Sequence, residues 1–301
     1  MRLVKPAVVV LGASGRLGRP LVSLLSAAGI DTIAVTRSPC TRQSSAIGWI
    51  TGELSDRGDQ ARVVTAVSER FGGSARVVVV DLVLDRSGVD GMRRSVQAST
   101  DTVLRLRDRL RECAAQPHLI AASTTAVLAP GLYQTPYGLA KRRQVITYAR
   151  AGIPGMALLL PVLRQAAADA APQPWPGWSF DHAANELRSA VEVAPDSTFT
   201  VFTVKVPSLG GVAADGQTNP PIPAVLRAHL QCLLTDRNNL HAHRRAARFR
   251  LGLSPPQLRR RVDHHHAPAE LIRRFADRYH VTIVRDHAVS TPDGGGTPPH
   301  A

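Results

Sequence analysis

The stretch Ala7-Val8-Val9-Val10-Leu11-Gly12-Ala13-Ser14-Gly15-Arg16-Leu17-Gly18 joins a short β-branched run to a turn that contains three glycines. After it, apolar residues recur at helical spacing from Leu17 to Ala28, as far as Gly29. This order predicts a strand, a tight turn and a helix. Glycines in such a turn let the backbone approach a pyrophosphate, which then lies on the N-terminus of the helix. We therefore expect a dinucleotide site formed by Gly12, Ser14, Gly15, Arg16, Leu17 and Gly18.

The rest of the N-terminal half alternates between apolar runs and helical patterns. Strands are expected at residues 32–35, 76–83, 118–122 and 156–162, and helices at residues 59–70, 92–113 and 137–151. Continuous apolar strands separated by helices are typical of a parallel sheet that helices cover on both faces. The expected fold class is α/β, with a Rossmann-type doubly wound parallel sheet in residues 1–165 as the dinucleotide-binding domain.

The pattern changes after residue 165, where proline-rich stretches enclose an expected helix near 183–193 and an extended segment at 198–206. We interpret residues 166–290 as a smaller C-terminal cap or lid with substrate-binding elements, and residues 291–301 as a disordered tail. Only 4% of the residues are aromatic, so three large rings within six residues of the cap predict a flat wall for a polycyclic ligand, or anchors of the cap on the sheet. The candidate substrate-binding residues are Trp175, Trp178, Phe180 and His182, the last either a polar handle or a loop residue.

The formal net charge of +14 comes almost wholly from arginine, since only Lys5, Lys141 and Lys205 are lysine. The chain has no zinc finger, RNP sequence or aromatic interleaving of its basic residues, so nucleic acid is not an expected partner. Histidines at 241, 243 and 264–266 lack a carboxylate or cysteine set that would complete a metal site, and no metal is expected.

Apolar runs are far shorter than the roughly 18 residues that a membrane-spanning helix needs. The N-terminus lacks the apolar core of a secretory signal, and the three cysteines have no paired spacing. These features predict a cytoplasmic protein with reduced thiols and no membrane partner. The sequence leaves the oligomeric state open.

The end of the second expected strand predicts which dinucleotide binds. An acidic residue at this place hydrogen-bonds the ribose hydroxyls of NAD, whereas here the sequence is Thr36-Arg37-Ser38. Arg37 and Ser38 can bind a 2′-phosphate, and Arg16 can reach toward it from the glycine turn. NADP(H) is therefore the expected cofactor, although Arg37 could also be a solvated surface arginine.

A second motif follows the strand that ends at Ser123-Thr124-Thr125. Tyr137 and Lys141 are four residues apart, so they lie on one helix face, where the ammonium can lower the pKa of the phenol and hold a ribose. The Thr124 hydroxyl can bind a substrate carbonyl while the phenol protonates the developing alkoxide. This arrangement suits the reduction of a ketone, with Thr124, Tyr137 and Lys141 as candidate catalytic residues.

The glycine turn, the Glu53-Leu54-Ser55-Asp56 segment, the 123–127 stretch and Tyr137–Lys141 together resemble the short-chain dehydrogenase/reductase superfamily, in its extended or atypical branch. The resemblance covers about residues 6–162. It implies that Leu54 flanks the adenine, that Leu82 lies beside the cofactor, that Lys141 holds the ribose and that Pro161 borders the nicotinamide. It also implies an NADPH-dependent reductase whose substrate is a polycyclic aromatic ketone.

Several departures from the family pattern leave alternatives open. Thr124 and Tyr137 are separated by an unusually short segment, and the family usually has small residues where this chain has Asp81-Leu82-Val83. The proton for the alkoxide could therefore come from Tyr137 or, equally, from a phenol of the substrate or from solvent; Tyr133 is a rival in sequence. A second hypothesis is a non-catalytic NADP(H)-binding redox sensor, a role of some atypical members.

Overall fold

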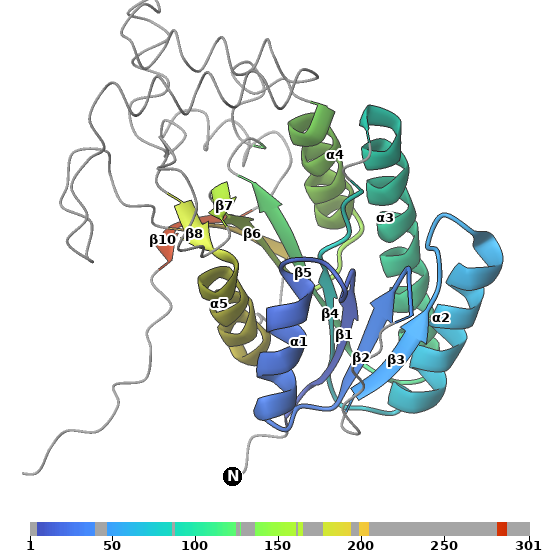
Figure 1. Ribbon diagram of the computed structural model, residues 1–301. Helices are drawn as coiled ribbons and strands as arrows, with labels where there is room; N and C mark the ends of the chain where they lie inside the picture. The colour runs from blue at the N-terminus through green and yellow to red at the C-terminus, as the bar shows by residue number, and fades with distance from the viewer. Residues whose placement is uncertain are drawn as a thin grey trace, which may run out of the picture.

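The protein is described by a computed structural model (Figure 1). The structure describes residues 5–39, 47–85, 88–124, 127, 136–160, 162–164, 177–193, 199–204 and 282–287. The expected tail at 291–301 and most of the expected cap lie outside the described residues.

A single large sheet forms the centre of the fold. Its strands are β1 (Ala7–Leu11), β2 (Thr32–Thr36), β3 (Ile47–Thr51), β4 (Val77–Asp81), β5 (Pro117–Thr124), β6 (Gly155–Leu160), β9 (Phe199–Val204) and β10 (Thr282–His287). They lie in the order β10-β9-β6-β5-β4-β1-β2-β3, and every neighbouring pair is parallel. Two further short strands, β7 (Val162–Arg164) and β8 (Gly177–Ser179), pair with each other in a separate parallel sheet.

Helices cover both faces of the large sheet (Figure 1). On one face lie α2 (Arg57–Phe71), α3 (Val89–Glu112) and α4 (Pro136–Arg150), and on the other lie α1 (Gly18–Ala27) and α5 (Phe180–Val193). Central strands alternate their side chains between the two cores, so that Val77 and Val79 face α2–α4 whereas Val78 and Val80 face α1 and α5. Burial on both faces explains why these strands read as continuous apolar runs.

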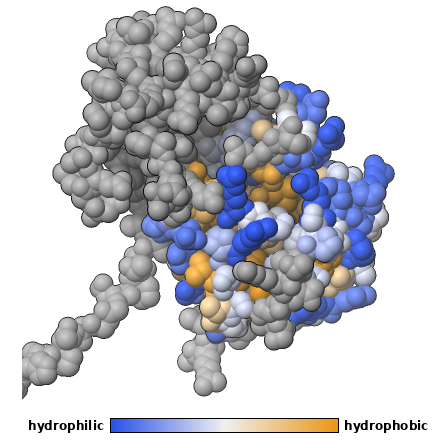
Figure 2. All heavy atoms as spheres, in the orientation of Figure 1, coloured by the Kyte–Doolittle hydropathy of each residue, from blue (hydrophilic) through white to orange (hydrophobic). Residues whose placement is uncertain are grey.

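The outer surface agrees with this layering. Hydrophilic side chains cover the flank of the molecule over α2, α3 and α4, while apolar side chains show toward the middle of the view (Figure 2). The prediction of an α/β fold with a Rossmann-type parallel sheet is confirmed.

Two details of the sequence-based organisation differ from the structure. The edge strand β3 was not expected, because Gly48 interrupts its pattern and its side chains are largely half-buried. The sheet also continues past residue 165, since β9 and β10 extend it beyond β6 and α5 packs on the same face as α1. The sheet thus runs on into the extended segment expected at 198–206, and the domain boundary near residue 165 stays a prediction.

Candidate functional site

The candidate residues come from the carboxyl ends of neighbouring parallel strands. The glycine turn follows β1, Arg37 and Ser38 follow β2, Leu82 follows β4, and Thr124 ends β5. Strands of one parallel sheet present their carboxyl ends at the same edge, and ligands of open α/β sheets bind in the crevice outside that edge. The structure thus places these sequence-predicted residues along a common edge.

Backbone geometry explains two of the three glycines in the turn. Gly12 has a φ of +82°, a left-handed conformation that side chains disfavour. A Cβ on Gly18 would lie 2.4 Å from the Gly12 carbonyl oxygen and 2.6 Å from that of Ala13, so helix α1 can approach the strand only with glycine here. The turn is therefore built for close backbone packing, as the sequence predicted.

The N-terminus of α1 has the properties of an anion site. Its N-cap residue, Leu17, makes no side-chain capping bond, and the first turn holds no acidic residue. By contrast, α2 begins after Asp56, whose carboxylate accepts a hydrogen bond from the Asp59 N–H at 2.9 Å. The α1 terminus thus offers its N–H dipoles to a ligand rather than to the protein's own side chains. A turn that has no room for a side chain at Gly18 and a helix N-terminus without a side-chain cap both fit a pyrophosphate group.

Arg37 and Ser38 are both exposed at the end of β2. Arg37 lies beside two carboxylates that follow β4 and β3, with Nη1 at 3.3 Å from Asp85 Oδ2 and Nε at 4.0 Å from Glu53 Oε2. Arg37 can bind a 2′-phosphate only if it leaves these two carboxylates or contacts the phosphate and the carboxylates together. Sequence reasoning found the arginine but missed the two acids beside it.

Two candidate cofactor contacts differ in exposure. Leu82 is half-buried, and its backbone N–H donates to the Leu11 carbonyl at 3.1 Å, which keeps it beside the glycine turn. Leu54 is 6% exposed and belongs to the core beneath α2 and α3, where its carbonyl accepts from Gln60 Nε2. The Leu54 side chain therefore serves the core as well as any adenine that would rest on it.

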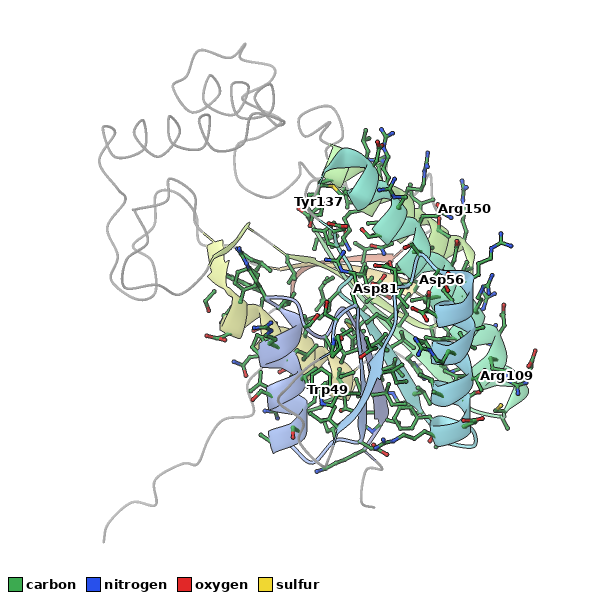
Figure 3. All side chains as sticks on the ribbon, turned by 45° about the vertical axis from the view of Figure 1, so that its right-hand side comes forward. Trp49, Asp56, Asp81, Arg109, Tyr137 and Arg150 are labelled. Carbon is green, nitrogen blue, oxygen red and sulfur yellow. The ribbon has the colours of Figure 1, made fainter. Side chains whose placement is uncertain are left out.

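Helix α4 turns a polar face toward the sheet. Tyr137, Lys141, Gln144 and Tyr148 recur at intervals of four, three and four residues, which places them on one side of the helix. Asp81, at the end of β4, lies below Tyr137 in the interior of the fold (Figure 3). The helical spacing of Gln144 and Tyr148 after Tyr137 was a signal of this buried polar face that sequence reasoning did not use.

Lys141 is only 3% exposed, and its ammonium donates to Gln144 Oε1 at 3.0 Å. Burial lowers the pKa of the Lys141 ammonium, and the nearby Asp81 carboxylate acts in the opposite direction. The lysine that sequence reasoning assigned to a ribose is thus directed toward the protein interior in this structure.

Asp81 is the last residue of β4, and its side chain turns into the core. Its side chain is fully buried on the α3 and α4 face, where it accepts hydrogen bonds from Ser99, Gln144 and Tyr148. Of the three residues that stand where the family usually has small ones, only Leu82 and Val83 remain candidates to lie beside the cofactor.

The two hydroxyls that end β5 point to opposite faces. Ser123 follows the alternation of Ala121, which faces α2–α4, whereas Thr124 follows Ala122, which faces α1 and α5. The Ser123 hydroxyl is buried and has no hydrogen-bond partner among the residues that the structure describes. Ser123, which sequence reasoning passed over in favour of Thr124, is thus the hydroxyl on the same face as Tyr137 and Lys141.

The described part of the cap places two aromatic candidates near β8. The ring of Trp178 meets that of His182 edge-on, with centroids 4.5 Å apart, and Phe180 begins α5. His182 Nε2 lies 3.8 Å from Glu186 Oε1, one helical turn further along α5. Trp175 and Pro161, also predicted as site residues, lie outside the described residues, as does Tyr133.

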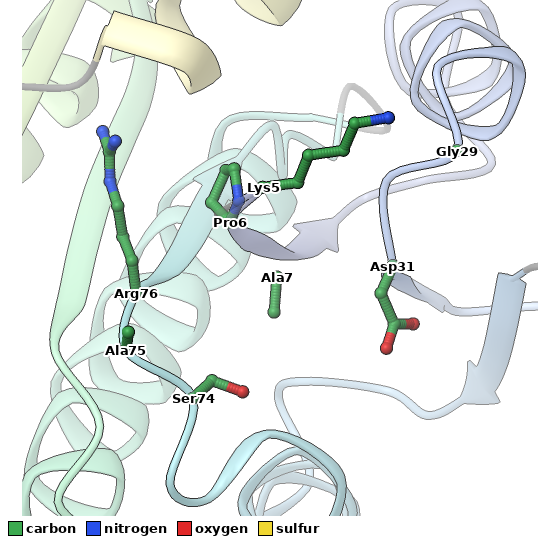
Figure 4. A pocket seen from close by; sticks show the side chains of 8 residues that line it. All are labelled: Lys5, Pro6, Ala7, Gly29, Asp31, Ser74, Ala75 and Arg76. Carbon is green, nitrogen blue, oxygen red and sulfur yellow. The ribbon is translucent and has the colours of Figure 1, made fainter. Parts of the chain in front are cut away.

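A separate groove of about 280 Å³ lies at the opposite edge of the sheet, where β1 and β4 begin (Figure 4). It is lined by Lys5, Pro6, Ala7, Gly29, Asp31, Ser74, Ala75 and Arg76. None of the sequence-predicted site residues borders it.

Within the described ranges, no three His, Cys, Asp or Glu side chains gather as metal ligands. The histidines at 241, 243 and 264–266 lie outside those ranges. No helix in the described part of the chain combines the length and apolar character needed to cross a membrane.

Residues 8–151 match the family described as the NAD dependent epimerase/dehydratase family. The match runs from β1 to the end of α4, the segment that holds the glycine turn and the polar face of α4. This segment is therefore similar in sequence to that family. A comparison with curated proteins finds no match.

Solved structures share the fold at low sequence identity. A short-chain type dehydrogenase/reductase from Mycobacterium ulcerans has 14% identity and a TM-score of 0.52, over 68% of this chain and 90% of its own. ElxO with NADP bound has 12% identity and a TM-score of 0.53, over 66% and 97% of the two chains. The Bordetella bronchiseptica enzyme WbmG, in complex with NAD and UDP, has 12% identity and a TM-score of 0.51, over 73% and 82%. These solved structures support the predicted fold, and the family match supports the predicted NAD(P) cofactor.

Proposed function

We propose that the protein is an NADPH-dependent ketoreductase that reduces a ketone of an aromatic polyketide, of the angucyclinone type, to a secondary alcohol in antibiotic biosynthesis. The observation that carries the proposal is the shared edge of the sheet. At this edge the glycine turn and the uncapped N-terminus of α1 follow β1. The polar face of α4 follows β5, and only β4 separates β5 from β1 in the sheet. The substrate class rests on the resemblance of the whole chain to the angucyclinone ketoreductase of simocyclinone biosynthesis.

Each part of the site has a distinct role in this proposal. Gly12, Ser14, Gly15, Arg16, Leu17 and Gly18 bind the pyrophosphate, and Arg37 with Ser38 selects a 2′-phosphate. When bound, the dinucleotide supplies a hydride to the carbonyl carbon. Trp178, together with Phe180 and Trp175, provides a flat apolar surface, and the His182 ring that meets Trp178 edge-on adds a polar group to it.

A hydroxyl from β5 and a phenol from α4 complete the chemistry. Thr124, or Ser123 on the α4 face, donates a hydrogen bond to the substrate oxygen, and Tyr137 supplies the proton that the alkoxide needs. A phenol of the substrate or solvent is an equal alternative to Tyr137. Holding the reactants in place is worth about 7–11 kcal/mol, whereas general acid catalysis contributes about 10²–10⁴-fold, so the larger contribution does not depend on Tyr137.

Label transfer tests the proposal. The protein is incubated with NADPH deuterated at the transferable position and a panel of angucyclinone and other aryl ketones, and the products are analysed by mass spectrometry. Deuterium in one alcohol product establishes hydride transfer and identifies the substrate class. Tight NADPH binding without label in any ketone of the panel contradicts the reductase.

The Tyr137→Phe variant then separates the two proton sources. A loss of turnover of less than tenfold excludes Tyr137 as an essential donor, and a loss of 10²-fold or more supports it. Thr124→Val and Ser123→Ala, measured with the same product, show which β5 hydroxyl contacts the substrate.

A non-catalytic NADP(H)-binding sensor is the second candidate. Lys141 is 3% exposed, and its ammonium is bonded to Gln144 rather than directed outward. This inward direction favours the sensor. It predicts NADPH binding with no turnover of any ketone.

A further inference from the structure

Beneath the site lies a buried polar cluster, the Asp81 cluster, that consists of Asp81, Ser99, Lys141, Gln144 and Tyr148. Their exposures are 0%, 0%, 3%, 1% and 0%, although two of the five carry formal charges. Burying charged groups away from water is costly unless they are hydrogen-bonded and compensated. The cluster joins three elements, β4, α3 and α4.

Asp81 accepts four hydrogen bonds. Its Oδ2 is 2.6 Å from both Gln144 Nε2 and Tyr148 Oη and 3.1 Å from Ser99 Oγ, and its Oδ1 accepts from the Val83 N–H at 3.1 Å. An ionised carboxylate accepts hydrogen bonds only, and every contact here is made by a group that can donate one. The carboxylate thus has its hydrogen bonds, and no cation among the described residues is in direct contact with it.

Gln144 connects this carboxylate to Lys141. Its Nε2 faces Asp81 and its Oε1 accepts from Lys141 Nζ at 3.0 Å. Because a carboxylate only accepts and an ammonium only donates, the amide has one favourable orientation between them. The result is a chain of carboxylate, amide and ammonium that runs from the end of β4 into α4.

The charges around Lys141 come from few elements. From β4 it faces Asp81, which favours its ammonium form, while burial disfavours that form and lowers its pKa. From α3 the cluster receives the neutral hydroxyls of Ser99 and Thr100. From α4 it receives Gln144 and Tyr148, whose pKa is raised well above its ordinary value by burial and by Asp81, so the phenol stays neutral.

We propose that Asp81 is the buried counter-charge of Lys141, acting through the amide of Gln144 to keep Lys141 an oriented ammonium ion on α4. Asp81 is then a positioning residue for the lysine and touches neither cofactor nor substrate. This inference rests on the proposed function and deepens it, because only the ammonium form of Lys141 can lower the pKa of Tyr137, one helical turn away on α4.

The lysine content of the chain makes a direct test feasible, since Lys5, Lys141 and Lys205 are its only lysines. Protein labelled with ε-¹³C-lysine gives three side-chain signals, which Lys5→Arg and Lys205→Arg assign by elimination. Each signal is followed against pH without cofactor or substrate. The titration midpoint of Lys141 then reports its charge directly.

Two variants interrupt the hydrogen-bonded series of carboxylate, amide and ammonium at different points, and a third is a matched control. Asp81→Asn removes the charge, and the titration midpoint of Lys141 falls by about one pH unit or more because the ammonium loses its counter-charge. Gln144→Met keeps the volume but breaks the bridge, and the midpoint falls in the same direction. Tyr148→Phe removes one hydrogen bond to Asp81 but neither the charge nor the bridge, and the midpoint stays within about 0.3 pH unit of the parent protein.

Unchanged Lys141 midpoints in folded Asp81→Asn and Gln144→Met proteins overturn the proposal, as does an equal fall in Tyr148→Phe. If Asp81→Asn does not fold, Gln144→Met carries the test alone.

The two proposals fail separately. If the parent protein does not bind NADPH, the proposed function is refuted, whereas the lysine titration still supports or refutes the role of Asp81.

Discussion

Gly18 offers the sharpest perturbation of the cofactor turn. A Cβ at this position would lie 2.4 Å from the Gly12 carbonyl oxygen, whereas ordinary contacts begin at 3.4 Å, so Gly18→Ala forces the turn or helix α1 to move by about 1 Å. The atoms in the way belong to the backbone of Gly12 and Ala13 and cannot rotate aside. Overpacking of this kind costs about 1–3 kcal/mol.

This cost has two measurable consequences. For a domain of this size, about 1–3 kcal/mol lowers the melting temperature by about 2–12 °C. If the displaced turn must return to its original place to bind the pyrophosphate, the same energy weakens NADPH binding by about 5- to 160-fold. Differential scanning calorimetry measures the first effect, and isothermal titration calorimetry measures the second.

Gly73→Ala is the matched control. Gly73 has a left-handed φ, +84°, which Gly18 does not have, but a Cβ there meets no atom within 4 Å, and it follows α2, away from the glycine turn. We expect this variant to lose stability through backbone strain, about 1–2 kcal/mol, with its NADPH affinity unchanged. A Gly18→Ala protein with the parent's melting temperature and affinity would refute the reasoning, as would a loss of affinity in Gly73→Ala equal to that in Gly18→Ala.

Further predictions concern the edges of the site and its buried support. Arg37→Ala should weaken NADPH by about tenfold or more in a fluorescence titration and leave NADH nearly unchanged, because a charge-assisted bond to the 2′-phosphate is lost. Asp85→Asn should instead strengthen NADPH by up to about fivefold, since the exposed pair at 3.3 Å no longer competes for Arg37; weaker binding would contradict this role. Ser123→Ala should reduce turnover more than Thr124→Val if the α4 face carries the reaction, and the reverse order would return the role to Thr124. Tyr148→Phe should cost about 1.5–3 kcal/mol in urea unfolding, because its hydroxyl bonds a buried carboxylate at 2.6 Å, and an unchanged midpoint would refute that contribution.

The parallel sheet and the glycine turn were predictable because their signals are local. Val8, Val9 and Val10 are buried on both faces, so the strand reads as an unbroken apolar run, and the glycines follow it directly. The edge strand β3 gave no such signal, since one side of it meets solvent and Gly48 breaks its pattern. Local patterning thus finds central strands more easily than edges.

The sequence predicted which residues form the candidate site but not the direction in which their side chains point. Lys141 was found from its spacing to Tyr137, yet its buried bond to Gln144 depends on Asp81, which is 60 residues away in the chain. The choice between Ser123 and Thr124 required the register of β5 against α4. A single-sequence pattern does not contain these long-range relations, whereas the four-three-four spacing on α4 could have revealed that Gln144 and Tyr148 share the face of Lys141.

The central claim is that NADPH binds at the carboxyl edge of the sheet, and hydrogen–deuterium exchange with and without NADPH tests it most directly. The account predicts slower exchange in peptides that contain the 12–18 turn, residues 36–38 and residues 81–83, with no change around Ser74 and Arg76 at the opposite edge. Protection confined to the groove at that opposite edge, or no protection at saturating NADPH, would contradict the account.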